Sequence, residues 1–163
     1  MPRTATADRV PREQLLAFLR PRHRALLTTR RADGSPQLSP VAAGVDAEGR
    51  VVVATYPQRA KVRNVRRDPR VSLCFLSDDW DDAWVQVDGT AEVLAPPEAL
   101  DAFVEYYRSI AGEHPDWDDY RAAMVRQGKV LLRVCIERWG PVATGGFPPE
   151  LAGPSLDSWQ DGA

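Results

Sequence analysis

The sequence predicts an α+β fold in which a small antiparallel β-barrel of Greek-key type carries peripheral helices. Three observations favour this class: six short segments have strand composition, turns join most of them, and helical patterns gather late in the chain. A chain of 163 residues with 44% apolar side chains can bury one core. We assign residues 11–139 to this domain, and residues 140–163, which are rich in proline and glycine, to a tail.

The amino-terminal part predicts one helix and three strands. Residues 11–20 place leucine and phenylalanine at helical spacing behind an early proline. Residues 25–30 and 37–45 have strand composition, and Asp33-Gly34 between them supplies the positive φ of a hairpin turn. Residues 51–55 are dense in valine, which predicts a strand buried on both faces and antiparallel to the strand before it.

The middle of the chain predicts a short basic helix and a second hairpin. In residues 58–67 two valines lie three apart among arginine and lysine, and Asp68-Pro69 ends the run. Residues 70–77 then alternate apolar and polar side chains, as a strand does. An acidic turn at residues 78–82 leads to the next expected strand, residues 83–94.

Two helices and a final strand are expected after this hairpin. Residues 100–111, which follow a pair of prolines, carry an apolar stripe at helical spacing. Asp116 can cap a further helix over residues 117–127, and Gly128 can end it. Residues 130–136 alternate apolar and polar side chains along a last strand.

Composition excludes several classes of function. A net charge of −2 excludes a globally basic nucleic-acid binder, and no apolar run is long enough to cross a membrane. Residues 1–10 lack the apolar stretch of a secretory signal, so we expect a cytoplasmic protein without a membrane partner. Cys74 and Cys135 lie in apolar runs and are expected to be small buried hydrophobes, not part of a disulfide framework or a zinc site.

The most informative local pattern is a strand end that enters the basic helix over residues 55–64. Free backbone N–H groups of the first helical turn, its positive dipole end, Arg59 and Lys61 would converge on one anion, for which a phosphate is the obvious candidate. A solvated basic helix face explains the same spacing. A nucleic-acid patch is a third interpretation, but no aromatic platform accompanies it.

Other polar groups allow weaker interpretations. Gln37 and Ser39 share a strand face and could hydrogen-bond a flat polar ring, although polar alternation on a half-exposed strand is the commoner explanation. The acidic stretch at residues 113–119 is better explained by helix start signals than by a metal site. Trp80 and Trp84 could form an aromatic wall of a pocket, while core or interface packing suits Trp84 better.

Four segments together resemble one family. They are the hairpin Asp33-Gly34-Ser35-Pro36-Gln37-Leu38-Ser39, the basic segment at residues 59–70, the strand Asp88-Gly89-Thr90-Ala91, and the long block at residues 107–121. In this order they resemble the pyridoxamine 5′-phosphate oxidase superfamily of split β-barrel flavin and deazaflavin oxidoreductases, in particular its actinobacterial branch that uses coenzyme F420. The resemblance spans residues 15–139 and implies a six-stranded split barrel. It also implies a homodimer with two cofactors in grooves between the subunits.

The resemblance also implies site residues. Lys61 and Arg59, with Ala60 between them, correspond to the phosphate contacts, and Asn64 supports them. The remaining positions fall into three groups: the ring side of the groove, the backbone of the third strand, and a loop that is expected near the groove of its own or of the partner subunit. They are Gln37, Ser39 and Pro40 for the first, Ala54 and Thr55 for the second, and Asp79 and Trp80 for the third.

Two departures bear on the cofactor and the reaction. Ala60 stands where the oxidases carry an arginine, and no histidine follows His114 to complete their late Arg-x-His motif, so we do not expect pyridoxamine phosphate oxidation. We therefore expect reduced coenzyme F420 to pass a hydride to a conjugated small-molecule acceptor, for which no catalytic side chain is assigned. Flavin mononucleotide (FMN) is the alternative cofactor, and a non-catalytic flavin or tetrapyrrole carrier is the alternative function.

Overall fold

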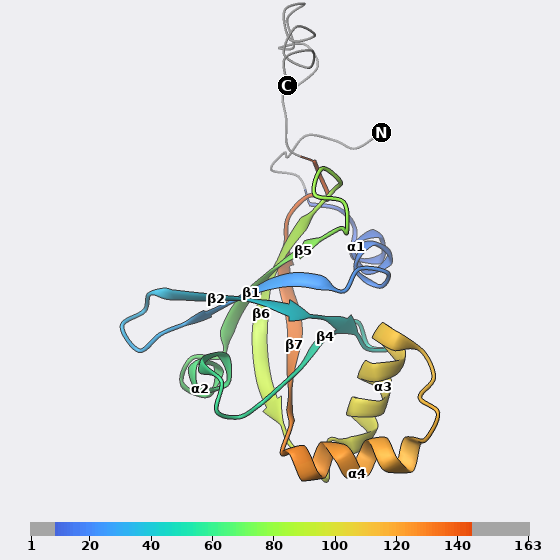
Figure 1. Cartoon of the computed structure of the whole chain (residues 1–163). Helices are drawn as coiled ribbons and strands as arrows, with labels where there is room; N and C mark the ends of the chain where they lie inside the picture. Colours follow the sequence, from blue (N-terminus) through green and yellow to red (C-terminus); the bar gives the residue numbers. More distant parts are fainter. Residues whose placement is uncertain (1–8, 145–163) are drawn as a thin grey trace, which may run out of the picture.

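The computed structural model describes residues 9–144, which form one antiparallel sheet with helices around it (Figure 1). The strands lie in the order β2-β1-β5-β6-β7-β4-β3. The elements, in chain order, are α1 Arg12–Leu19, β1 Arg24–Arg30, β2 Pro36–Ala42, β3 Gly44–Val45, β4 Val51–Thr55, α2 Ala60–Arg67, β5 Arg70–Leu76, β6 Val85–Leu94, α3 Leu100–Ala111, α4 Trp117–Gln127 and β7 Val130–Trp139. The predicted α+β class and both predicted hairpins are confirmed.

The sheet has seven strands where six were expected, because the predicted strand over residues 37–45 is two strands. β2 pairs with β1 at one edge of the sheet, whereas β3 pairs with β4 at the other edge. The chain changes partner at Ala43, which is fully buried and donates its N–H to the His23 carbonyl at 2.9 Å. Since one continuous segment serves both edges, the sheet must curl, and β2 approaches β4 without pairing with it.

The curled sheet encloses the larger hydrophobic core. Alternate residues of the strands point inward, as Leu73 and Phe75 of β5 do, and both are fully buried. Two helices contribute to the same core from different sides: α1 inserts Leu15 and Leu19, and α2 inserts Val62 and Val65. The predicted helices at both places are confirmed.

A second, smaller core lies between the sheet and the pair α3 and α4 (Figure 1). In β7 the neighbours Leu131 and Leu132 are both buried, one in each core, because this strand is covered on both faces. The predicted helix ends of α4 are confirmed: the Asp116 side chain accepts a hydrogen bond from the Asp119 N–H at 3.0 Å, and Gly128 ends the helix in a left-handed conformation.

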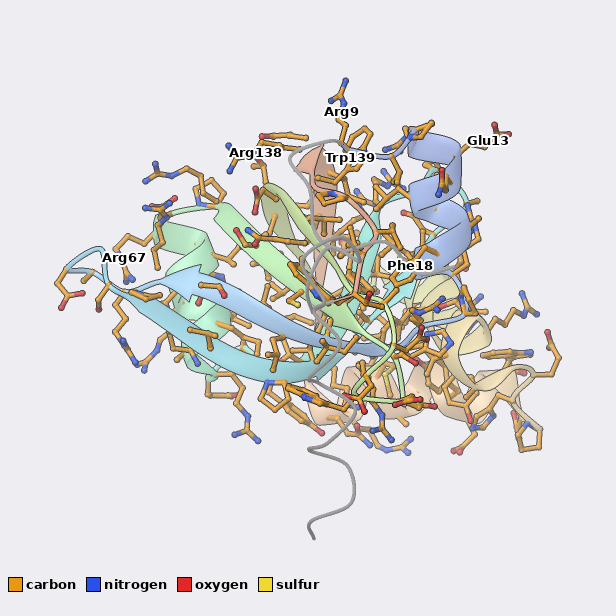
Figure 2. The ribbon with its side chains drawn as sticks, turned by 90° about the horizontal axis from the view of Figure 1, so that it is seen from above. Arg9, Glu13, Phe18, Arg67, Arg138 and Trp139 are labelled. Carbon is orange, nitrogen blue, oxygen red and sulfur yellow. The ribbon has the colours of Figure 1, made fainter. Side chains whose placement is uncertain are left out.

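The ends of the described chain are fastened to the barrel. Trp139 Nε1 donates a hydrogen bond of 2.6 Å to the Val10 carbonyl, and the Arg9 guanidinium stacks over the Trp139 ring (Figure 2). At the other terminus Ala143 exchanges two backbone hydrogen bonds with Trp84, so the first residues after β7 continue the sheet ladder. The rest of the predicted tail, residues 145–163, lies outside the described residues.

The expected burial of both cysteines is wrong for one of them. Cys74 is half-buried, but Cys135 is exposed, because its position in β7 turns it to the outward side while Val134 points into the core. Strand β7 is covered by other elements along only part of its length, so not every residue of its apolar run is buried. Both cysteines are free. None of the helices formed by residues 9–144 has the length and apolar character that a membrane span requires.

Candidate functional site

The amino end of α2 follows directly from the end of β4. Strand β4 ends at Thr55, a turn follows, and Arg59 becomes the residue before the helix, with extended backbone angles. Within the part of the chain that the structure describes, no side chain caps this end of the helix. Its first-turn N–H groups and the positive end of the helix dipole are therefore available to an anion.

Lys61 lies in the first turn of α2 and is half-buried. Burial of its ammonium group, and then the positive charge of Arg59, lower the pKa of Lys61 below its ordinary value. Two cations that repel each other beside uncapped N–H groups make a strongly positive position, which a bound anion would relieve. The residues present thus fit the phosphate group of a cofactor.

A chain of hydrogen bonds holds α2 against the barrel. The Asn64 side chain is buried and uses both its ends: Nδ2 donates to Thr29 Oγ1 at 3.0 Å, and Oδ1 accepts from Arg67 at 2.8 Å. Thr29 Oγ1 in turn donates to Gln37 Oε1 of β2 at 3.2 Å, and Arg67 also donates to the Arg30 carbonyl at 2.9 Å. Since both ends of its amide form hydrogen bonds within the protein, Asn64 is a positioning residue for α2 in this structure.

The predicted residues of β2 divide between two faces. Gln37 and Ser39 lie half-buried on one face, as expected, whereas Pro40 lies on the opposite, exposed face beside Leu38, which is 57% exposed. The Ser39 hydroxyl oxygen is buried and has no hydrogen-bond partner among residues 9–144. It is a polar atom on the inner face of β2 that a bound polar group could satisfy.

The end of β4 offers backbone groups opposite this face. Ala54 and Thr55 pair with β7 on one side only, because β3 reaches no further along β4 than Val52 in the described structure. Strand β2 lies near this edge but is not paired with it. The gap between β2 and β4, with the amino end of α2 beside it, is the candidate cofactor cradle.

The structure does not bring Asp79 and Trp80 to the cradle of their own chain. They lie in the loop between β5 and β6, whereas α2 lies towards the other end of β5 (Figure 1). The seven residues of β5 alone span roughly 20 Å. The Trp80 side chain is 83% exposed and, with Asp79, borders a groove of about 660 Å³.

Sequence analysis missed two pairs of residues that shape these features. Thr29 and Arg67 complete the hydrogen-bond chain through Asn64, and a polar threonine on an inward strand position was the available signal. Leu26 and Cys74, from two different strands, form part of the floor of the Trp80 groove. That pairing of strands has no local sequence signal.

The block at residues 107–121 builds an aromatic cluster that joins α3 to α4. The rings of Tyr107, His114, Trp117 and Tyr120 pack at centroid distances of 5.0–5.7 Å, mostly edge to face. His114 Nδ1 accepts a hydrogen bond from the Asp116 N–H at 3.0 Å. Among residues 9–144 no group of three or more His, Cys, Asp or Glu side chains is arranged to hold a metal ion.

Comparisons with known proteins identify the family to which the fold belongs. A family model described as pyridoxamine 5′-phosphate oxidase matches residues 11–143. An F420H(2)-dependent biliverdin reductase of Mycobacterium tuberculosis is 32% identical over 127 residues, which are 77% of this chain and 84% of that protein.

Solved structures share the fold. A conserved hypothetical protein of Mycobacterium tuberculosis has a TM-score of 0.71 at 25% identity, and the match covers 94% of this chain and 98% of that one. A structure named as an F420 reductase has a TM-score of 0.54 at 19% identity, with 72% of this chain and 88% of that one covered. Because the family model spans most of the barrel, the chain belongs to the pyridoxamine 5′-phosphate oxidase family.

Proposed function

We propose that this protein is a reductase that uses reduced coenzyme F420 and transfers a hydride to a conjugated small molecule. The observation that carries the proposal is the cradle: uncapped N–H groups at the start of α2, with Arg59 and Lys61, lie beside the gap between β2 and β4. The family match and the 32% identity to an F420H(2)-dependent reductase support a redox function over a carrier function.

Each part of the cradle has its own role in the proposed binding of the cofactor. Lys61 and Arg59 bind the cofactor phosphate, and the Ala54 and Thr55 backbone with Ser39 meet the polar edges of the ring. Asn64 keeps α2 in place through Thr29 and Gln37. When bound, the reduced deazaflavin supplies the hydride, while water supplies the proton that completes reduction of the acceptor. The chain itself orients the two reactants and excludes water from between them.

The proposal includes a homodimer. Within one chain the Trp80 loop and the cradle lie at opposite ends of β5, so neither closes over the other (Figure 1). A second copy related by a twofold axis would set the Trp80 loop of each subunit against the cradle of the other. The exposed Leu38 and Pro40 of β2 lie on the outer face that such a copy would cover.

FMN is the second candidate cofactor, because the matching family model is named for a flavin-dependent oxidase type. Ala60 weighs against it, since its methyl group gives a flavin phosphate no donor where the oxidases have an arginine. A direct comparison separates the two cofactors. The purified protein is titrated with F420 and with FMN under identical conditions, and bound ligand is measured by fluorescence.

Preferential binding of F420, followed by oxidation of F420H2 in the presence of an electron acceptor, is the expected result. Tighter binding of FMN would replace the deazaflavin assignment with a flavin-dependent one. Binding of neither cofactor would overturn the proposal and leave the carrier or interaction function.

A further inference from the structure

The Trp80 groove lies on the outer face of the sheet, at the opposite end from the cradle of the same chain. Its volume of about 660 Å³ falls in the range of small-molecule sites. The groove is lined by Leu26 of β1 and by Cys74 and Leu76 of β5. The antiparallel pairing of β1 with β5 brings these residues together.

Two tryptophans border the groove in different ways. Trp84 is half-buried, and its backbone exchanges hydrogen bonds of 3.0 and 3.2 Å with Ala143, so its position is set by the sheet ladder. Trp80 belongs to the loop and is 83% exposed. Both tryptophans line the groove, and their aromatic rings suit a flat conjugated ligand that can stack on them.

The rim of this groove is acidic, and its charges are only partly neutralised. Asp82 pairs with Arg22 at 3.4 Å. Asp78, outside the groove lining, pairs with Arg24 at 2.9 Å. Asp79 and Asp81, which both line the groove, form no ion pair with any of residues 9–144.

These two carboxylates are exposed at the rim, beside an apolar floor, so they act on a ligand at close range and salt screens their field. A ligand with carboxylates of its own would meet repulsion at the rim, while a neutral or cationic ligand would not. The groove therefore combines an apolar, aromatic lining with a filter against anions.

We propose that this groove holds the electron acceptor, and that the acceptor is a flat conjugated molecule without anionic groups. The inference rests on the proposed function for the acceptor's role, and it narrows the substrate class of that site. It also separates this chain from the curated relative, which is named for biliverdin, a dicarboxylate. In the proposed dimer the groove of one subunit faces the cradle of the other.

A pair of probes with one chromophore tests the filter directly. Biliverdin and its dimethyl ester differ only in the two carboxylates, and isothermal titration calorimetry measures the affinity of each for the wild-type protein. We expect the ester to bind about tenfold tighter than the diacid, and we expect this preference to shrink at high salt. Equal affinities, or tighter binding of the diacid, would overturn the inference.

A matched pair of variants locates the effect. Asp79→Asn with Asp81→Asn removes both unpaired rim charges and should bring the two affinities to within about threefold. Glu98→Gln with Asp118→Asn removes the same charge from exposed positions before α3 and on α4, and should leave the preference unchanged. An unchanged preference in the rim variant would overturn the inference, as would loss of the preference in the distant variant.

Failure of the proposed function has a different signature. F420 binding is measured separately on the wild-type protein, because it reports on the cradle without either probe. If the protein binds F420 but binds the two probes equally well, the groove inference is wrong and the proposed function is unaffected. If the protein binds neither probe, the groove inference is also wrong, and the groove is assigned to the contact with a second copy. In that case sedimentation velocity should show that the Trp80→Lys variant no longer forms a dimer.

Discussion

Asn64 of α2 donates a 3.0 Å hydrogen bond to the hydroxyl of Thr29 in β1, and both side chains are buried. This contact joins the helix that carries Lys61 to the strand that pairs with β2. The positive charge of the cradle and the face of β2 that carries Gln37 are thus held at a set separation. Rigid support of this kind is what a site needs to position a cofactor.

The Asn64–Thr29 contact should stabilise the fold. Asn64→Ala leaves the Thr29 hydroxyl buried without this partner, and we expect it to lower the free energy of unfolding by about 2 kcal/mol. Thr29→Val removes the hydroxyl with similar shape, so the double variant should cost about 1 kcal/mol less than the sum of the single ones. Urea unfolding of the four proteins measures this coupling. Strict additivity would show that the contact is not formed in solution.

Lys61 should carry a large part of the cofactor affinity. Lys61→Ala removes a charge-assisted contact with the phosphate, and we expect F420 affinity to fall by about 1.5–3 kcal/mol, on the order of 10- to 100-fold. Arg66→Ala is the matched control, because it removes one positive charge from the exposed last turn of the same helix. Fluorescence titration should show less than about a threefold change for the control. Equal losses in both variants would mean that only the overall charge of α2 matters.

Gly89 should resist substitution. A Cβ at this position would overlap the Cys135 carbonyl across the irregular pairing of β6 and β7. Because the backbone of the neighbouring strand cannot move aside without a large energetic cost, Gly89→Ala should destabilise the protein by about 3 kcal/mol or prevent folding. Gly140→Ala meets no atom within 4 Å and serves as the control, with little expected change in thermal unfolding. Similar melting temperatures for both variants would contradict the tight approach of these strands.

The two free cysteines should react at different rates. Cys135 is exposed, whereas Cys74 is half-buried and its burial raises the pKa of the Cys74 thiol. Since the thiolate is the reactive form, a thiol reagent at pH 8 should modify Cys135 first and Cys74 slowly. Time-resolved mass spectrometry follows both sites, and Cys135→Ser should abolish the fast phase. In the proposed dimer Cys74 would be protected further.

Asp68 should contribute to stability in a pH-dependent way. Hydrogen bonds from the Arg70 side chain and backbone lower the pKa of Asp68 from 3.8 to about 2. A depressed folded-state pKa gives stability that is present above pH 3.8 and is lost as the pH falls towards about 2. The stability difference between wild type and Asp68→Asn should therefore shrink between pH 4 and pH 2 in urea titrations. Because Asp68 is only partly buried and its partner Arg70 is exposed, we expect the difference to be small at every pH and reduced by salt.

Local chemistry let the sequence predict most elements and one part of the cradle. The ends of α4 depend on Asp116 and Gly128 alone, and the buried strand β4 follows from its run of valines. The anion-binding potential near Lys61 also arises within a few residues, because a helix N-terminus and its flanking charges are sequence neighbours. Such features need no knowledge of the rest of the chain.

Pairings between distant segments were decided only by the tertiary structure. The change of strand partner at Ala43 depends on which edges of the sheet come close to each other. It divides the continuous strand pattern of residues 37–45 into two strands, β2 and β3. The burial of Thr29 against Asn64 and the exposure of Cys135 depend on what covers each strand face. The separation of Trp80 from the cradle of its own chain follows from the direction of β5. The sequence by itself thus determined the local elements and the charge beside Lys61, while the curling of the sheet decided how these parts face one another, because strand pairing is a long-range interaction.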